Sequence, residues 1–342
     1  MPAWGRALWP ELPVTLDDVD AARDRIMGVV VRTPLVPAPE LSERCGAQVS
    51  LKLEGVQPTG SFKVRGAASK IRSLPPDAAV RGVVTASTGN HGRAVAYVAR
   101  SIGVSATVCV SELVPPGKMR ALRALGCDLV VGGRSQADGL VTAAGLVVER
   151  GMTLVHPFDD REVIAGQGTI GREIVEQAPE VTTIVVPLSG GGLISGVAVA
   201  AKALRPRVRV IGVSMRRGAV MAASLDRGRP VELEEAPTLA DSLQGGIGTD
   251  NRFTLVMTRA LVDEVVLLTE QQIWDGMRFA FDHHRLLLEG GGAVGIAALL
   301  AGRIAPRGQI VAVASGANAE DEQVAALARG DGTPPSGDDP GA

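Results

Sequence analysis

The residue of this chain best suited to covalent chemistry is Lys63, which stands between an aromatic and a β-branched residue in Ser61-Phe62-Lys63-Val64. A turn rich in Pro and Gly, residues 55–60, precedes it, and an apolar, strand-like segment, residues 49–53, precedes the turn. A lysine that loses hydration also loses part of its preference for the charged form, and a neutral amine can form a Schiff base with a carbonyl. The alternative is an exposed lysine that opens a helix, since most lysines lie on the surface.

Two glycine-rich turns could bind anionic groups near such an amine. One is Ser189-Gly190-Gly191-Gly192-Leu193, between an apolar strand-like segment, residues 183–187, and a helix-like segment, residues 193–204. Glycines let backbone N–H groups converge on one anion, and the start of a helix adds positive potential, which suits a phosphate. A purely structural turn is the alternative. The spacing does not fit the dinucleotide fingerprint, because Ser195 stands where its third glycine would be.

The other turn is Ser87-Thr88-Gly89-Asn90-His91-Gly92, which follows the short apolar segment 82–85. Its hydroxyl and backbone N–H groups can donate hydrogen bonds to a carboxylate. A histidine at this place is more typical of a helix start than of a catalyst, so His91 is given no role in proton transfer.

Taken in this order, the lysine motif, the S-x-G-N-H motif and the glycine loop resemble those of the threonine/serine dehydratases, which are pyridoxal-phosphate enzymes of the second fold type. The resemblance extends from about residue 16 to about residue 325. It implies that Lys63 holds pyridoxal 5′-phosphate, that Phe62 packs near its ring, and that the loop from Ser189 to Leu193 binds its phosphate. It further implies that Asn90 bonds the 3′-hydroxyl oxygen and that Ser315, in Ser315-Gly316-Ala317-Asn318, bonds the pyridine nitrogen.

The resemblance also implies a reaction. The substrate carboxylate would dock on Ser87, Thr88, Gly89, Asn90 and His91, and the Lys63 amine would remove the α-proton as a general base. The β-hydroxyl would leave, and the net products would be a 2-oxo acid and ammonia. A serine at position 315, unlike a carboxylate, would not keep the pyridine nitrogen protonated, which favours elimination.

Two further stretches match the family without a settled role. Glu289 precedes Gly290-Gly291-Gly292, as a family glutamate precedes a helix that starts with glycine, and this assigns it to the substrate site. The alternative is a solvated carboxylate at a helix N-terminus. The run Ala240-Asp241-Ser242 also matches a family motif, but the sequence assigns Asp241 no function.

The order of segments predicts an α/β fold with parallel sheets and flanking helices. Between residues 82 and 156, short apolar segments alternate with longer amphipathic ones, and a second such series follows to residue 314. Together with the resemblance, this predicts a two-domain fold like that of the tryptophan synthase β-subunit. Residues 1–81 and 157–328 would form a large cofactor-binding domain and residues 82–156 a small one, with a disordered tail over 329–342.

Composition excludes several classes of protein. The net charge of −2, without a long basic run, argues against a nucleic-acid surface. No apolar run reaches the length of about 18 residues that a membrane helix needs, and residues 1–14 lack the apolar core of a signal peptide. Three widely spaced cysteines, Cys45, Cys109 and Cys127, are typical of reduced thiols in a cytoplasmic protein.

The sequence therefore predicts a pyridoxal-phosphate-dependent dehydratase (ammonia-lyase) that acts on a β-hydroxy amino acid of the threonine/serine type, and the resemblance implies a homodimer. No metal is expected, because Ser214 and Val220 stand where some family members carry a glutamate and an aspartate ligand.

Four alternatives stay open. The stretch from Leu243 to Gly248 is similar to the hydroxyectoine-utilisation branch, whose substrate would be a hydroxylated diaminobutyrate derivative. An amino-acid racemase is a second alternative, because racemases of this family carry a serine where Thr88 stands, on the face of the cofactor opposite the lysine. A β-replacement synthase and a non-catalytic protein that binds a phosphorylated ligand are the others.

Overall fold

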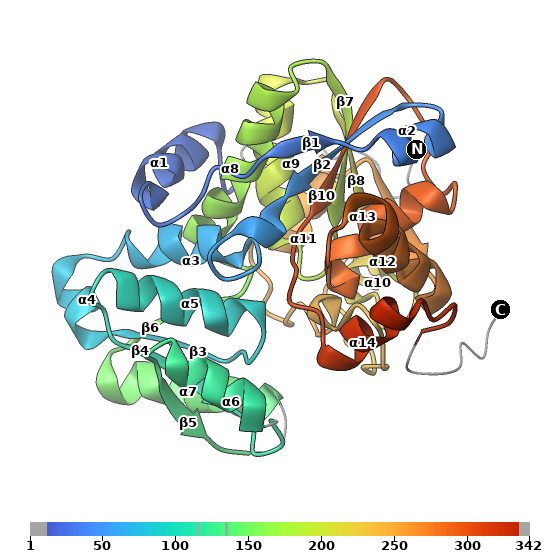
Figure 1. Ribbon diagram of the computed structural model, residues 1–342. Helices are drawn as coiled ribbons and strands as arrows, with labels where there is room; N and C mark the ends of the chain where they lie inside the picture. Colours follow the sequence, from blue (N-terminus) through green and yellow to red (C-terminus); the bar gives the residue numbers. More distant parts are fainter. Residues whose placement is uncertain (1–11, 115, 134–135, 335–342) are drawn as a thin grey trace.

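The computed structural model describes residues 12–114, 116–133 and 136–334 and arranges them around two sheets (Figure 1). The expected absence of a signal peptide concerns mainly residues 1–11, which lie outside the described residues. No helix within the described ranges is long and apolar enough to cross a membrane.

The larger sheet has the strand order β1-β2-β10-β7-β8-β9. All neighbouring strands are parallel except β1, which pairs with β2 in the antiparallel direction. The strands are β1 (Leu35–Pro37), β2 (Gln48–Leu53), β7 (Val181–Pro187), β8 (Arg209–Met215), β9 (Glu264–Leu268) and β10 (Gln309–Ala314).

Helices cover both faces of this sheet, because side chains alternate between the faces along each strand. In β10, Ile310, Ala312 and Ala314 pack on one side, while Val311 and Val313 pack on the other. The first side is covered by α2 (Pro39–Cys45), α12 (Glu270–His284), α13 (Gly290–Leu300) and α14 (Asp321–Arg329). The second is covered by α8 (Arg161–Gln177), α9 (Gly192–Leu204), α10 (Val220–Arg227) and α11 (Thr254–Leu261).

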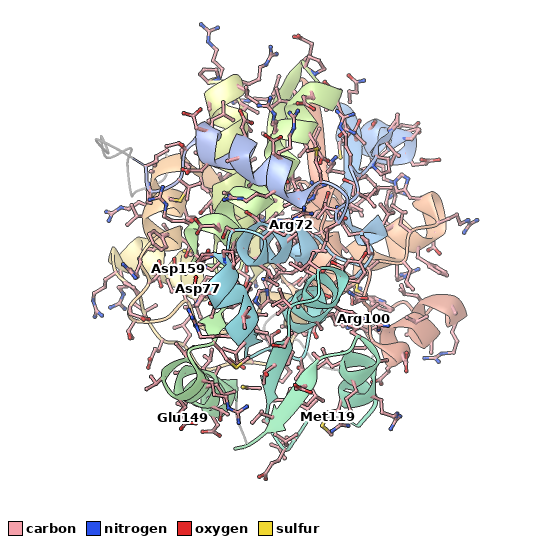
Figure 2. The ribbon with its side chains drawn as sticks, turned by 90° about the vertical axis from the view of Figure 1, so that its left-hand side faces the viewer. Arg72, Asp77, Arg100, Met119, Glu149 and Asp159 are labelled. Atoms are coloured by element: carbon pink, nitrogen blue, oxygen red, sulfur yellow. The ribbon has the colours of Figure 1, made fainter. Side chains whose placement is uncertain are left out.

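The smaller sheet is fully parallel and has the order β5-β4-β3-β6. Its strands are β3 (Val83–Thr85), β4 (Ala106–Val110), β5 (Asp128–Val131) and β6 (Thr153–Leu154). The helices α5 (Asn90–Ser101) and α6 (Pro116–Ala124) lie on one face, and α7 (Gln136–Arg150) lies on the other. Figure 2 shows Met119 of α6 and Glu149 of α7 on opposite sides of this sheet.

Helices α1 (Leu16–Ile26), α3 (Lys63–Ile71) and α4 (Pro76–Arg81) complete the fold. Helix α3 lies between the two sheets, where it packs against α8 of the larger part and α5 of the smaller part (Figure 1). The predicted α/β fold with parallel sheets and flanking helices is confirmed, with β1 as the antiparallel exception.

The predicted domain boundaries stay a prediction, although every strand of the smaller sheet lies inside residues 82–156. Part of the segment expected to be a disordered tail makes contacts with α12. Trp274 Nε1 donates to the carbonyl of Asp331, and Gln271 Nε2 donates to that of Gly332. Residues 335–342 of that segment lie outside the described residues.

Candidate active site

Lys63 is the first residue of α3, and its amine faces the chain that links the two sheets. The helix starts there because the preceding turn ends at Gly60, whose φ of 74° is in the left-handed region. The Phe62 N–H then donates to the carbonyl of Ser315 at 3.0 Å, which ties the turn to the end of β10. Lys63 Nζ donates to the carbonyl of Pro157 at 2.8 Å and lies 5.3 Å from the centroid of the Phe62 ring.

Burial lowers the pKa of the Lys63 amine to about 8, although the carboxylate of Glu289 acts in the opposite direction. The physical cause is the loss of hydration, which destabilises the charged form. At neutral pH a much larger fraction of this amine is neutral than in an ordinary lysine. This property suits a nucleophile toward a carbonyl compound and a base toward a carbon acid.

This pKa gives the first testable prediction. In cofactor-free protein, the rate of reaction between Lys63 and a small aldehyde should rise about tenfold per pH unit and level off above about pH 8, because only the neutral amine attacks. Borohydride trapping followed by mass spectrometry of the Lys63 peptide measures this, with Nα-acetyl-lysine in the same solution as the control. A rate that still rises at pH 10 would contradict the desolvated environment.

The glycine loop joins the end of β7 to the start of α9. Gly191 has a φ of 88° and caps the helix, which begins at Gly192. The first N–H groups of a helix have no partner within it, so those of Gly192, Leu193 and Ile194 are free to bind an anion. The side chain of Leu193 packs in the core, so only its backbone N–H is a candidate ligand.

The same loop packs directly on the segment that contacts Lys63. A Cβ atom added to Gly192 would lie 2.9 Å from the backbone of Phe158, and one added to Gly190 would lie 2.4 Å from the Phe158 ring. Phe158 follows Pro157, whose carbonyl accepts the hydrogen bond from Lys63. The predicted phosphate loop and the predicted reactive amine therefore meet at residues 157–158.

The second turn lies at the start of α5, which begins at Asn90 with Gly89 as its N-cap. Gly92 is required because a Cβ atom there would lie 1.9 Å from the carbonyl oxygen of Ser87. The hydroxyls of Ser87 and Thr88 make no hydrogen bond with any other described residue. The turn can thus offer two hydroxyls and the first-turn N–H groups of α5 to a carboxylate.

The imidazole of His91 is hydrogen-bonded to the backbone and stays neutral, so it is a poor candidate for proton transfer. Its Nε2 lies 2.8 Å from the carbonyl of Val155, and burial lowers its pKa to about 3, with the nearby charge of Lys63 adding to the effect. A neutral, buried ring does not donate a proton at neutral pH. The contribution of His91 to a substrate site is therefore its backbone N–H.

Asn90 connects the smaller part of the molecule to the larger one. Its Nδ2 donates to both carboxylate oxygens of Glu289, at 2.7 and 3.0 Å, and its Oδ1 accepts from Asn318 at 2.6 Å. Asn318 also donates to the carbonyl of Thr59, four residues before Lys63. Glu289 is only 4% exposed, and its pKa is raised, chiefly by burial, while the hydrogen bond from Asn90 opposes that shift.

Ser315 directly follows the last residue of β10 and lies beside the start of α13. Its Oγ donates to the carbonyl of Gly291 over 3.4 Å, a long contact that leaves the hydroxyl able to turn to another acceptor. The next residue, Gly316, lies against Glu289, since a Cβ atom there would be 2.5 Å from Oε1. The carboxylate and the Ser315 hydroxyl are therefore held in one neighbourhood, which also includes the turn before Lys63.

Sequence reasoning did not identify several members of this site. The Pro157 carbonyl is a backbone group, so the type of side chain at position 157 does not predict its contact with Lys63. Asn318 lies within the quoted run after Ser315, yet only the fold brings it to Asn90. Ser242, which hydrogen-bonds Glu289, and Asp241, whose charge raises the pKa of Glu289, come from the short helix η2 (Asp241–Leu243).

This set of donors fits pyridoxal 5′-phosphate. Free N–H groups at the N-terminus of α9 can bind the phosphate. The desolvated primary amine of Lys63 can bind the aldehyde, and the Ser315 hydroxyl can donate to the heteroaromatic ring. Within the described residues, no group of three or more His, Cys, Asp or Glu side chains is arranged to hold a metal ion. The chemistry of the residues thus suits an organic, phosphorylated aldehyde.

Comparisons with known proteins agree with this geometry. The family described as "Pyridoxal-phosphate dependent enzyme" matches residues 26–316. The chain is 52% identical over 300 residues to "Putative threonine dehydratase" of Sinorhizobium fredii, covering 88% of this chain and 90% of that protein. It is 42% identical over 306 residues to the "L-threonine ammonia-lyase" of Thermotoga maritima, covering 89% and 76%. The structure of maize serine racemase superposes with a TM-score of 0.87 at 32% identity, covering 93% of this chain and 97% of that one.

The chain therefore belongs to the family of pyridoxal-phosphate dependent enzymes, in their second fold type. Within that family it is a member of the threonine/serine dehydratase group, as the lysine motif and the glycine loops predicted.

Proposed function

We propose that this chain is a pyridoxal-phosphate-dependent ammonia-lyase that converts L-threonine or L-serine into a 2-oxo acid and ammonia. The observation that carries the proposal is the position of Lys63. Its amine is desolvated and lies at the segment 157–158, on which the phosphate-binding loop also packs. Relatives named for this activity support the substrate class.

The amine, the glycine loop and the two hydroxyls each have a task in this reaction. The N–H groups of Gly192, Leu193 and Ile194 hold the phosphate, and Lys63 would hold the aldehyde carbon. When bound, pyridoxal phosphate supplies an electron sink for the negative charge left at the substrate α-carbon. The hydroxyls of Ser87 and Thr88 orient the substrate carboxylate, and the Lys63 amine takes the α-proton. Overall, one amino acid becomes one 2-oxo acid and one ammonia, because the water lost in elimination is regained in hydrolysis.

Two measurements test the proposal together. Borohydride treatment of the protein with pyridoxal phosphate should attach the cofactor to the peptide that contains Lys63, as mass spectrometry can show. Assays with L-threonine, L-serine, hydroxyaspartate and a hydroxylated diaminobutyrate should detect 2-oxo acid and ammonia in equal amounts for L-threonine or L-serine. Attachment to another lysine, or no ammonia from either substrate, would refute the proposal.

Racemisation is the second candidate function, and the free hydroxyl of Thr88 favours it. The superposable maize structure is named as a serine racemase. A racemase needs an acid–base group on each face of the reacting carbon, and Thr88 could act opposite Lys63. The methyl group of threonine restricts χ1, so we propose that this hydroxyl serves mainly as a carboxylate donor and that racemisation is minor.

The variant Thr88→Ala separates the two functions. We expect ammonia release to fall by less than about tenfold and D-amino acid formation to disappear, because the loss of an acid–base group would reduce a reaction by about 100-fold or more. Thr88→Ser keeps the hydroxyl and is the matched control, which should retain both products. Chiral analysis beside the 2-oxo acid assay decides: D-amino acid formed as fast as oxo acid in the wild type would make the enzyme a racemase.

The hydroxyectoine-utilisation branch remains a proposal about the substrate side chain. The stretch that is similar to that branch, Leu243 to Gly248, begins at the last residue of η2, which packs against the start of α13 beside Glu289. Residues of this loop can therefore contact the part of a substrate that lies beyond its β-carbon. The assay with a hydroxylated diaminobutyrate tests the assignment directly.

The remaining proposals concern the setting of the enzyme. The resemblance supports a homodimer, and the three free thiols support a cytoplasmic location. Light scattering during gel filtration tests the first of these, and fractionation of cells tests the second.

A further inference from the structure

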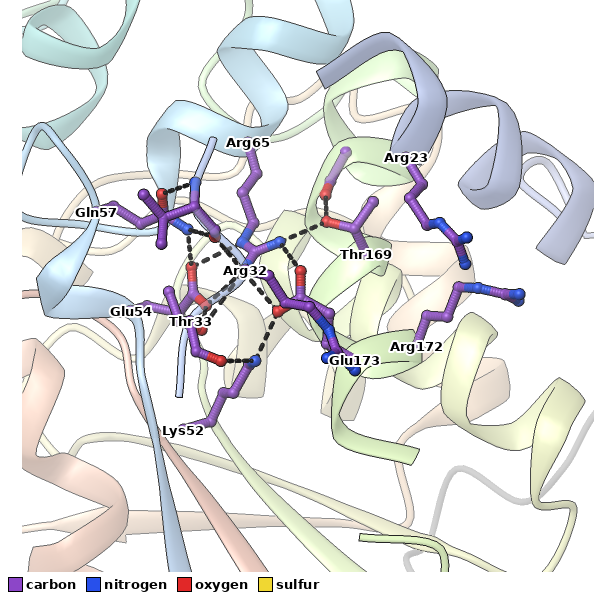
Figure 3. Close-up of polar contacts among 12 residues, drawn as sticks. Arg23, Arg32, Thr33, Lys52, Glu54, Gln57, Arg65, Thr169, Arg172 and Glu173 are labelled. Carbon is purple, nitrogen blue, oxygen red and sulfur yellow. Dashed lines mark hydrogen bonds and ion pairs between the residues drawn. The ribbon is translucent and has the colours of Figure 1, made fainter. Parts of the chain in front are cut away.

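A buried cluster of charged side chains surrounds Arg65, which stands two residues after Lys63 in α3 (Figure 3). It contains two cations and two anions, each from a different part of the chain: Lys52 of β2, Glu54 of the short helix η1 (Glu54–Val56), Arg65 of α3 and Glu173 of α8. Three of these side chains are 0% exposed and Glu173 is 12% exposed. The proposed reaction gives none of them a task.

Arg65 occupies the centre of the cluster. Its Nε and Nη2 donate to the two oxygens of Glu54, at 2.8 and 2.9 Å. Its Nη1 and Nη2 donate to the two oxygens of Glu173, at 2.7 and 2.9 Å. The planar guanidinium thus forms a two-point hydrogen-bonded ion pair with one carboxylate on each of two edges. This geometry fixes its orientation as well as its position.

The rest of the cluster holds these carboxylates in place. Lys52 Nζ donates to Glu173 at 2.6 Å, to the carbonyl of Thr33 at 2.7 Å and to Gln177 at 2.8 Å, which uses all of its donors. The Thr33 hydroxyl donates to Glu54 at 2.6 Å. Burial alone would raise the pKa of Glu54, but Arg65 holds it below its ordinary value, so the cluster stays charged.

The position of Arg65 in the helix makes this cluster relevant to Lys63. Residues two apart in an α-helix point in directions that differ by about 200°. Lys63 therefore faces Pro157 and the site, while Arg65 faces the opposite way, into the cluster. Helix α8, which supplies Glu173, begins at Arg161, shortly after the Pro157 carbonyl that accepts from Lys63.

We propose that Arg65 is a positioning residue. Its guanidinium, which two carboxylates bind, fixes the rotation of the first turn of α3 about the helix axis and the distance of that turn from η1 and α8. It thereby holds the Lys63 amine in its desolvated place against residues 157–158. This inference rests on the proposed function only in taking Lys63 as the reactive amine. The arrangement is a Glu–Arg–Glu bridge between η1, α3 and α8, and Lys52 balances its second negative charge.

A charge-balanced double variant separates positioning from stability. Arg65→Met/Glu54→Gln removes one cation and one anion and leaves Lys52 paired with Glu173, so no lone charge is buried. In cofactor-free protein, the pH midpoint for acetylation of Lys63 should move up from about 8 toward the ordinary lysine value, because the amine regains water. With substrate, kcat should fall by about 100-fold with little change in KM, as expected for a misplaced reacting group.

The control acts on the same two elements at their other end. Lys70 of α3 lies 2.6 Å from Asp160, the N-cap residue of α8, and Lys70→Met/Asp160→Asn removes this pair while asparagine keeps the cap. It should leave the Lys63 midpoint and kcat unchanged. Arg65→Lys should show the Lys63 defect although it keeps the charge, because an ammonium cannot hold two carboxylates in one plane.

Three results would overturn the inference: an unchanged Lys63 midpoint in the Arg65→Met/Glu54→Gln variant, a wild-type midpoint and kcat in Arg65→Lys, or an equal defect in the Lys70 control. If the first variant does not fold, Lys52→Met/Glu173→Gln removes the other half of the cluster and must shift the midpoint in the same direction. The acetylation assay needs neither cofactor nor substrate. Attachment of pyridoxal phosphate to another lysine would therefore refute the proposed function and leave this test intact.

Discussion

Lys63→Ala should lower the rate of 2-oxo acid formation by about 10,000-fold or more and leave the protein folded. One amine both holds the cofactor aldehyde and removes the α-proton, so its loss removes two contributions, of which general base catalysis alone accounts for about 100- to 10,000-fold. The fold should survive because the Lys63 amine is held by one hydrogen bond, to the Pro157 carbonyl, and its charged form is destabilised by burial.

The measurements are initial rates with L-threonine and the thermal unfolding temperature, each compared with Lys70→Ala on the same helix. Lys70 pairs with Asp160 and does not face the site, so its variant should keep the wild-type rate. If Lys63→Ala keeps more than about one hundredth of the activity while it binds pyridoxal phosphate, another group must be the base, and the assignment of Lys63 fails.

The parallel sheets were predictable because their strands carry strong local signals. In β4 every residue from Ala106 to Val110 is buried, and apart from Thr107 the segment is an apolar run bounded by serines. The antiparallel edge strand β1 was not predicted, since Leu35, Val36 and Pro37 are too few to show a period. Helix α2 was missed for a similar reason, because only Leu41 of its residues is buried. Such short elements are set by packing rather than by propensity.

The candidate site could be predicted where residue type carries the chemistry. A lysine after a Pro/Gly turn and two glycine loops can be recognised directly in the sequence. The structure brings the lysine and one loop together at Phe158. The network around Arg65 could not be predicted, because the run Lys-Val-Arg at a helix start is typical of an exposed surface. Only the tertiary fold brings Glu54 and Glu173 to either side of the guanidinium.

The glycine loop gives the other large expected effect. Gly192→Ala places a methyl group where the backbone of Phe158 lies 2.9 Å away, and backbone cannot move aside as a flexible side chain can. Residues 157–158 or the loop must shift, so the N–H groups at the start of α9 no longer converge on one phosphate. Because each hydrogen bond to a charged group contributes about 1.5–3 kcal/mol, the Kd for pyridoxal phosphate should rise by about 10- to 100-fold for each N–H group that is lost.

A comparison of two ligands makes this prediction specific to phosphate. Pyridoxal has the same aldehyde and ring but no phosphate, so its weaker affinity should change much less in Gly192→Ala than that of pyridoxal phosphate. Gly145→Ala is the matched control: this glycine lies inside α7 with no neighbour within 4 Å of an added Cβ, and the change should leave both affinities unaltered. Fluorescence titration of the cofactor-free wild type and the two variants with each ligand measures all six values. If Gly192→Ala weakens both ligands equally, the loop supports the fold rather than the phosphate, and the anion must bind elsewhere.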